Sequence, residues 1–187
     1  MSTRYGRRLL VATATTVLLA GCSAGARQSA PARETTGAPR PTVNALANVD
    51  PCTLATLDEV STALGAPAHV NTGDTSDPAR ISCLYIAGPS DTTVWAVAVR
   101  VSSYPGRAKD WFESNRTSRD DAKPVTGLGD DAFSYTEPGR YAYVEMLKGD
   151  LVVEVGYLWH GVDKAPVDMA SFIPRLVVLA GPVVKRV

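Results

Sequence analysis

Apolar and polar residues alternate along several stretches in the middle of the chain, which is typical of strands buried on one face. Residues 81–87 and 92–104 are rich in β-branched and aromatic side chains, and a turn-forming run at 88–91 separates them. In the second stretch, bulky and small side chains take alternate positions. We expect the bulky face to meet the core and the other face to be lightly covered. The bulky positions are Trp95, Val97, Val99 and Val101.

The clearest hairpin of the chain turns near Gly149, between two further alternating stretches. A two-residue turn fits at Lys148-Gly149 or at Gly149-Asp150. The second turn would set Glu145 opposite Glu154, and like charges directly opposite each other are destabilising. The sequence therefore predicts the Lys148-Gly149 turn. The buried face of this hairpin is expected to hold Ala142, Val144, Met146, Leu151, Val153, Val155 and Tyr157.

An apolar period of 3.6 residues predicts three helices. The first begins at a T-x-x-E capping box formed by Thr56 and Glu59, and Gly65 ends it. The second covers residues 105–116. Its inward side chains are expected to be Ala108, Trp111 and Phe112.

The third helix is predicted to start near Pro166 and to end at Gly181-Pro182. Pro174 lies inside its apolar pattern, so we expect a kink there, because proline has no backbone N–H to donate. The stripe consists of Met169, Phe172, Ile173, Leu176 and Ala180.

The elements thus follow the order helix, two or three strands, helix, three strands, helix. Helices interspersed with antiparallel hairpins favour an α+β fold. We expect a single domain over residues 49–187, with a twisted, mainly antiparallel sheet of about five to seven strands and three helices packed on it.

The beginning of the sequence predicts export. An uncharged apolar run, residues 9–21, follows three arginines, and it is too short to cross a bilayer, which needs about 20 residues. A positive start, a short apolar run and small residues at its end are typical of a signal peptide. The run ends in Leu19-Ala20-Gly21-Cys22, the pattern of a bacterial lipobox, in which Cys22 receives a diacylglyceryl group and becomes the first residue after cleavage. A plain signal peptide with an incidental cysteine is the alternative.

Residues 1–21 are therefore interpreted as a lipoprotein signal peptide, and residues 22–48 as the lipidated cysteine with a tether. The tether consists mostly of Ala, Pro, Thr, Ser, Gly and Arg. Such a composition cannot bury enough apolar surface to offset the entropy of ordering, so we expect a disordered segment. It would hold the domain on the extracytoplasmic face of the cell membrane.

Charge and cysteine content narrow the function classes. Residues 49–187 hold 13 Lys and Arg against 18 Asp and Glu, a net charge of −5, which disfavours nucleic acid as a partner. Two cysteines remain besides Cys22, and an even number in an oxidising compartment predicts a disulfide between Cys52 and Cys83. Two buried free thiols or part of a metal site are the alternatives. A metal is disfavoured because there is no C-x-x-C and only two histidines, so we expect no metal and no cofactor.

Several motifs together resemble a family of uncharacterised actinobacterial lipoproteins whose shared domain has no assigned activity. They are the lipobox, the Pro/Thr/Ala tether, DPCTLATLDEVSTALG at 50–65, SCLY at 82–85, GLGDDAFSY at 127–135 and VEMLKGDLVVEVGY at 144–157. The resemblance covers roughly residues 45–180. It implies a membrane-tethered domain in which Cys52 pairs with Cys83, the cysteine of a C-x-Y signature that ends at Tyr85. It supplies no catalytic residue.

Residues that carry chemistry are few. His160 with Asp163 or Asp168 is the one combination that could be argued as a catalytic dyad. The chain has neither the G-x-S-x-G nor the S-x-x-K motif of a serine hydrolase. The acidic pairs at 120–121 and 130–131 lack the spacing of a calcium loop, so solvated loop acids are the simpler interpretation.

Tyr143 falls on the face of its strand opposite the core, near Glu154, and is the candidate for an exposed aromatic on a partner surface. The sequence therefore predicts a non-catalytic domain that binds or senses an envelope protein, a polymer or a lipid. An envelope hydrolase using His160 or an acidic pair is one alternative, and a carrier of a small apolar ligand is the other.

Overall fold

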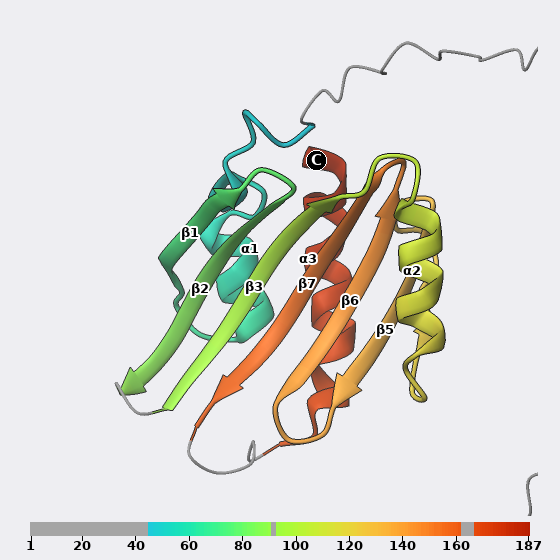
Figure 1. The fold of residues 1–187 in the computed structure, drawn as a ribbon. Helices are drawn as coiled ribbons and strands as arrows, with labels where there is room; N and C mark the ends of the chain where they lie inside the picture. Colours follow the sequence, from blue (N-terminus) through green and yellow to red (C-terminus); the bar gives the residue numbers. More distant parts are fainter. Residues whose placement is uncertain (1–44, 91–92, 162–166) are drawn as a thin grey trace, which may run out of the picture. The chain divides into compact units, whose positions relative to one another are not determined.

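A single open and twisted sheet of seven antiparallel strands organises the part of the chain that the structure, a computed structural model, describes: residues 45–90, 93–161 and 167–187 (Figure 1). The strands are β1 (His69–Asp77), β2 (Arg80–Ser90), β3 (Thr93–Ser103), β4 (Lys123–Pro124), β5 (Asp131–Glu137), β6 (Tyr141–Lys148) and β7 (Leu151–His160). Their spatial order is β1-β2-β3-β7-β6-β5-β4. The signal peptide, Cys22 and most of the tether lie outside the described residues, as do Asp163 and Pro166.

The sheet joins two meanders, each preceded by a helix. Strands β1 to β3 follow α1 (Leu57–Leu64), strands β4 to β7 follow α2 (Ala108–Thr117), and β3 pairs with β7. The chain continues into α3 (Ile173–Arg186). Figure 1 shows α1 and α3 behind the sheet and α2 in front of its other face. The predicted α+β architecture is confirmed.

The main core lies between the sheet and the pair α1 and α3. The bulky face of β3 contributes Val97, Val99 and Val101, as predicted, and all three are fully buried. Tyr85 from β2 and Leu176 from α3 fill the same layer and are also fully buried. A smaller cluster on the opposite face packs α2 against β5, β6 and β7. Its residues are Ala108, Phe112, Phe133, Tyr135, Leu147 and Val152.

The predicted turn of the β6–β7 hairpin is wrong. Lys148 pairs with Leu151, so the turn is Gly149-Asp150 and Glu145 lies directly opposite Glu154. Gly149 has a φ of 57°. A two-residue hairpin turn with a positive φ at its first central position needs glycine there, and a Lys148-Gly149 turn would place lysine at that position. The need for glycine at this turn position thus outweighs the unfavourable placement of two glutamates opposite each other. The predicted buried face is still correct, because the two registers differ by two residues and leave the same side chains on each face.

The last helix also differs from the prediction. Met169–Phe172 forms a short 3-10 helix, and Pro174 then lies in the first turn of α3, where its missing N–H breaks no helical hydrogen bond. The expected kink is therefore absent, since Pro174 does not lie in the interior of a helix. Pro182 does lie inside α3, which continues to Arg186. Val183 and Val184 are buried after it, so core packing holds the last turn in place despite the lost hydrogen bond.

The first two helices largely match the prediction, whereas one edge of the sheet does not. The capping box of Thr56 and Glu59 is present, and Gly65 ends α1 in the left-handed region with a φ of 73°. In α2, Ala108 and Phe112 are buried as predicted, but Trp111 is 38% exposed. Strand β1 was not predicted, because it is an edge strand whose residues are all exposed and show no apolar alternation.

The two cysteines of the domain form a disulfide. The bond joins Cys52, in the 3-10 helix Pro51–Thr53, to Cys83 in β2, across a sequence separation of 31 residues. The Cys83 side chain is 1% exposed. The hydroxyl oxygen of Tyr85, two residues further along β2, lies 3.1 Å from the carbonyl oxygens of both Cys52 and Ala55. The segment before α1 is thus held to the sheet by a covalent bond and a buried tyrosine.

Candidate functional site

A polar pocket of about 200 Å³ lies on the face of the sheet that α2 covers. We call it the carboxylate pocket, because two glutamates from neighbouring strands line it. Its charged and amide-bearing residues come from β2, β3, β6, β7 and the α2 region. They are Arg80, Arg100, Asn115, Arg119, Glu145 and Glu154.

Strand alternation places both glutamates in the pocket. On β6, Leu147 belongs to the cluster under α2, and Glu145 points to the same face two residues earlier. On β7, Val152 belongs to that cluster and Glu154 follows two residues later. The Gly149-Asp150 turn then sets the glutamates opposite each other. Glu145 is fully buried, and the Glu154 side chain is 13% exposed.

The two carboxylates have different partners. Arg100 on β3 donates a hydrogen bond of 2.6 Å to Oε1 of Glu154 and forms an ion pair with it. Glu145 has no ion pair with any described residue; Nδ2 of Asn115 on α2 donates to its Oε2 at 2.5 Å. Oε1 of Glu145 has no hydrogen-bond partner among the described residues.

The proton balance of the pair follows from these surroundings. Burial and the charge of Glu154 raise the pKa of Glu145, the hydrogen bond from Asn115 and the charge of Arg119 oppose the rise, and the resulting pKa is about 8. Burial also raises the pKa of Glu154, but the positive charge of Arg100 opposes this shift. The ion pair with Arg100 favours the charged form of Glu154, whereas Glu145 has no ion-pair partner among the described residues, so we assign the proton of the pair to Glu145.

Arg119 contributes the second unsatisfied group of the pocket. Its guanidinium carbon lies 4.4 Å from the ring centroid of Tyr135, and its NH1 group donates to Oε1 of Glu137 at 3.2 Å. Its Nε is buried without a hydrogen-bond partner. Across the described ranges, the buried side-chain polar atoms left unpartnered are this Nε and Oε1 of Glu145, so both belong to the carboxylate pocket. Native structures leave few such atoms, and each one needs an explanation.

The predicted partner-surface residue, Tyr143, lies beside this pocket rather than on an open surface. It is half-buried, and its ring stacks on Tyr135 with centroids 4.9 Å apart. A Cβ at Gly156 would lie 2.5 Å from the Tyr143 ring, so the ring covers β7 at a position where only glycine leaves room. Whether Tyr143 meets a partner stays a prediction; its contacts give it a packing role in the layer under α2.

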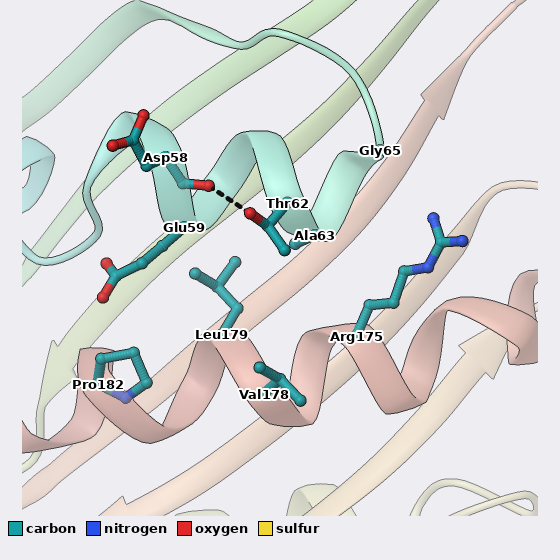
Figure 2. Close-up of a pocket in the computed structure, with 9 residues that line it drawn as sticks. All are labelled: Asp58, Glu59, Thr62, Ala63, Gly65, Arg175, Val178, Leu179 and Pro182. Atoms are coloured by element: carbon teal, nitrogen blue, oxygen red, sulfur yellow. Dashed lines mark hydrogen bonds between the residues drawn. The ribbon is translucent and has the colours of Figure 1, made fainter.

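A second concavity is an apolar groove of about 730 Å³ between α1 and α3 (Figure 2). Leu179 points from α3 toward α1, and Arg175 extends toward Gly65 at the end of α1. Val178 also lines the groove and is 73% exposed. Beneath the helices the core is filled by fully buried side chains, so this groove does not continue between the helices and the sheet.

The histidines are not part of either concavity. His160 is exposed at the end of β7, and His69 is exposed at the start of β1. Asp168 caps the 3-10 helix before α3 by accepting from the N–H of Ala170, and no hydrogen bond joins it to His160 among the described residues. Asp163 lies outside the described residues. The described geometry thus forms no His160–Asp168 dyad.

The acidic pairs have structural partners. Oδ2 of Asp130 accepts from the N–H of Gly149, and Asp131 pairs with Arg116. Asp121 accepts from the backbone N–H and the hydroxyl of Thr136. Within residues 45–90, 93–161 and 167–187, no three His, Cys, Asp or Glu side chains are grouped as a metal site requires.

The glutamate pair is the feature that sequence reasoning rejected. The sequence does contain a signal for this pair. Glu145 and Glu154 are charged residues within strands whose other side chains on the same face are mostly apolar or small. Arg100 takes one of the alternate positions of β3 that otherwise hold small side chains, which the sequence shows. No pattern in the sequence indicates that Asn115 and Arg119 face the sheet. Asn115 and Arg119 reach the glutamates because α2 packs across this face of the sheet.

Comparison with protein families identifies the chain. A family model described as "Protein of unknown function (DUF3558)" matches residues 17–159. The chain belongs to the DUF3558 family. The match spans the strands of the DUF3558 sheet and both carboxylates of the pocket. No curated protein matches the chain, and no solved structure does. No helix in the described ranges is long and apolar enough to cross a membrane.

Proposed function

We propose that this protein is an extracytoplasmic lipoprotein, anchored through Cys22, whose domain binds a small polar ligand in the carboxylate pocket without transforming it. One observation carries the binding proposal. Two buried polar atoms without a hydrogen-bond partner, Oε1 of Glu145 and Nε of Arg119, belong to residues that line the same pocket, and this pocket is large enough to admit a ligand. Leaving such groups unpaired costs about 1–3 kcal/mol each, and a ligand that meets them recovers this energy.

The anchoring proposal depends on the sequence and is supported by the disulfide. Disulfides persist in oxidising compartments, and the Cys52–Cys83 bond fits a domain outside the cytoplasm. The lipobox at 19–22 provides the attachment site, and the tether to residue 48 provides the reach. The partner in this proposal is a component of the cell envelope or its surroundings, and the membrane is contacted through the lipid.

A lipidation experiment tests the anchor. Cells expressing the full chain are labelled with a fatty-acid analogue, and the wild-type protein is expected to carry the label, whereas Cys22→Ala is not. Membrane fractionation of the same variant is a second measurement, in which Cys22→Ala is expected to leave the membrane pellet. Label retained by Cys22→Ala would contradict the anchor.

A ligand screen tests the binding role. The purified full chain is titrated with small anions, cations, zwitterions and neutral polar molecules while amide NMR shifts are recorded. We expect shifts at residues of the carboxylate pocket and none at the α1–α3 groove. The control variant is Arg175→Gln, which removes a charge from the groove and leaves the pocket intact. A screen without any pocket shift would overturn the proposal.

A hydrolase is the second candidate, because one carboxylic acid beside one carboxylate is the arrangement of a general acid and a general base. We rank binding first because the two unpartnered buried atoms of the pocket, Oε1 of Glu145 and Nε of Arg119, need hydrogen-bond partners, and a bound ligand supplies them. Glu145-dependent turnover of ester or glycan substrates would reverse this ranking. His160-dependent turnover would do so as well.

A further inference from the structure

We infer that the ligand of the carboxylate pocket is a small monoanion, of the size and chemistry of a simple carboxylate, held by the Arg119 Nε, Arg80 and the acid proton of Glu145. This inference rests on the proposed binding function and names the ligand class for the same site. It begins from the groups that the pocket leaves unpaired.

The pocket presents hydrogen-bond donors. Asn115 already donates to Oε2 of Glu145, and a fully buried carboxyl group with no ion-pair partner retains its proton, so Oε1 is the atom that carries it. The Nε of Arg119 is a donor under all conditions. Arg80 lines the pocket and makes no ion pair with any described residue, which adds a third set of donors. An acceptor-rich ligand satisfies all three.

The charges favour an anion as well. Three arginines line the pocket, and the groups that offset them are Glu154, paired with Arg100, and Glu137, paired with Arg119. With Glu145 protonated, one positive charge is left over, and a monoanion neutralises it. A cation would meet three guanidinium groups, and a dianion would overcompensate the charge.

The volume limits the size of the ligand. The pocket is partly open to solvent, and about 200 Å³ corresponds to roughly seven waters at 30 Å³ each, so the part of the ligand inside the pocket has on the order of four to seven non-hydrogen atoms. Trp111 and Tyr135 line the same pocket and offer apolar contact to a short aliphatic part. These limits fit a carboxylate of two to four carbons.

The pH dependence separates an anion from the other ligand classes. The titratable, charged and amide groups that line the pocket with Glu145 come from every element around it. They are Arg80 from β2, Arg100 from β3, Tyr104 after β3, Asn115 from α2, Arg119 after α2, Tyr135 from β5 and Glu154 from β7. An anion needs the protonated form of Glu145, so its affinity falls as pH rises through about 8. A cation or a zwitterion with its ammonium group at Glu145 needs the ionised form, so its affinity rises over the same range.

The test is an NMR titration of the full chain with acetate, propionate, inorganic phosphate, methylammonium and glycine at pH 6.5 and pH 9. Small ligands bind weakly, so concentrations reach tens of millimolar. We expect the carboxylates to bind with at least tenfold lower affinity at pH 9 than at pH 6.5. Methylammonium or glycine binding more tightly at pH 9 would overturn the anion and leave the binding function standing. No binding by any probe would overturn both.

Variants make the assignment specific. Glu145→Gln can place its amide NH2 group, a donor, where Oε1 of Glu145 lies, and its carbonyl oxygen, an acceptor, toward Asn115. It is therefore expected to bind acetate at pH 9 as well as at pH 6.5. Arg119→Lys keeps the charge but removes the Nε donor, and it is expected to bind at least tenfold more weakly. Arg175→Gln, remote from the pocket, is expected to bind like the wild type. Weaker binding by Arg175→Gln with no loss in Arg119→Lys would indicate binding to net charge alone and would contradict the inferred site.

Discussion

Glu145 and Glu154 lie directly opposite each other on β6 and β7, and of the two only Glu154 has an ion-pair partner among the described residues. The sheet tolerates this pair because the second carboxyl group keeps its proton. The arrangement makes the stability of the domain depend on pH in a direction opposite to that of most carboxylates.

The first prediction concerns this pH dependence. The pKa of Glu145 is about 8 in the folded chain, against an ordinary glutamate value of 4.5, so between these pH values the folded state holds a proton that the unfolded state has released. Stability is therefore expected to fall as pH rises from about 4.5 to about 8, by on the order of 5 kcal/mol at most, and to level off above that range. Urea unfolding across pH 5 to 9 measures it.

The matched variant for this prediction is Glu145→Gln. It remains neutral at every pH, so it is expected to remove the part of the decline that Glu145 causes and to exceed the wild type in stability at pH 8.5; a smaller decline from Glu154, whose pKa is also raised, is expected to remain. Parallel curves for the wild type and the variant would show that Glu145 ionises normally.

The second prediction compares two glycines before β5. Gly129 has a φ of 59°, and a Cβ there would lie 2.3 Å from the carbonyl oxygen of Leu147, which already accepts from the N–H of Asp130 at 2.8 Å. Gly127 has a φ of 81° with open space around it. Gly127→Ala is expected to cost about 1–2 kcal/mol from backbone strain alone. Gly129→Ala is expected to cost at least twice as much, because the backbone must also shift.

Chemical denaturation of the two variants provides the measurement. Similar losses at both positions would mean that the close approach to Leu147 is relieved without cost.

The third prediction concerns the disulfide. Removing the bond between Cys52 and Cys83 frees a loop with a sequence separation of 31 residues, and the loss is expected to be about 3–4 kcal/mol on the chain-entropy model. The double variant Cys52→Ala/Cys83→Ala is compared with the wild type with and without reductant. Non-reducing peptide mapping is expected to show the 52–83 link, and two free thiols in the native protein would refute it.

The fourth prediction concerns the contact between α1 and α3. Arg186 donates to both carboxylate oxygens of Glu59 at 2.7 Å and to the carbonyl of Leu54 at 2.9 Å. The hydrogen bond from Arg186 lowers the pKa of Glu59 to about 2. The pair therefore stabilises the fold above pH 4.5, and this contribution is lost as pH falls toward 2. Arg186→Ala is expected to cost about 1 kcal/mol at pH 7, since both side chains are partly exposed.

Lys185→Ala is the control for this contact, because it removes the same charge from an exposed neighbouring position. It is expected to change stability little. An equal effect of the two variants would assign the loss to net charge rather than to the contact with Glu59.

The fold was largely predictable because its elements carry strong local patterns. The alternating strand that became β3 and the capping box at Thr56 both reflect interactions within a few residues, and both are confirmed. Strand β1 escaped prediction because an exposed edge strand is held by backbone hydrogen bonds that leave no apolar pattern. The kink at Pro174 was predicted wrongly because a proline bends a helix only in its interior, and local sequence does not show that α3 starts at Ile173, directly before Pro174.

The candidate site was not predictable, for a reason that the β6–β7 hairpin makes plain. A rule against opposed glutamates assumes that both are ionised and in water. Glu145 is buried away from water, and we assign it a proton. Its burial depends on α2, which packs on the sheet from a separate part of the chain. Tertiary burial changed the charge state, and local rules have no access to it.

The position of the disulfide has a mechanical consequence. Helix α1 and strand β1 both lie inside the loop that the bond between Cys52 and Cys83 closes. Tension applied to the chain ahead of Cys52 passes through the disulfide directly into β2, the strand next to the edge strand β1, and bypasses the whole loop. A pull from the N-terminal side therefore cannot peel α1 or β1 away, and the first structure to resist it is the hydrogen-bonded pairing of β2 with β3.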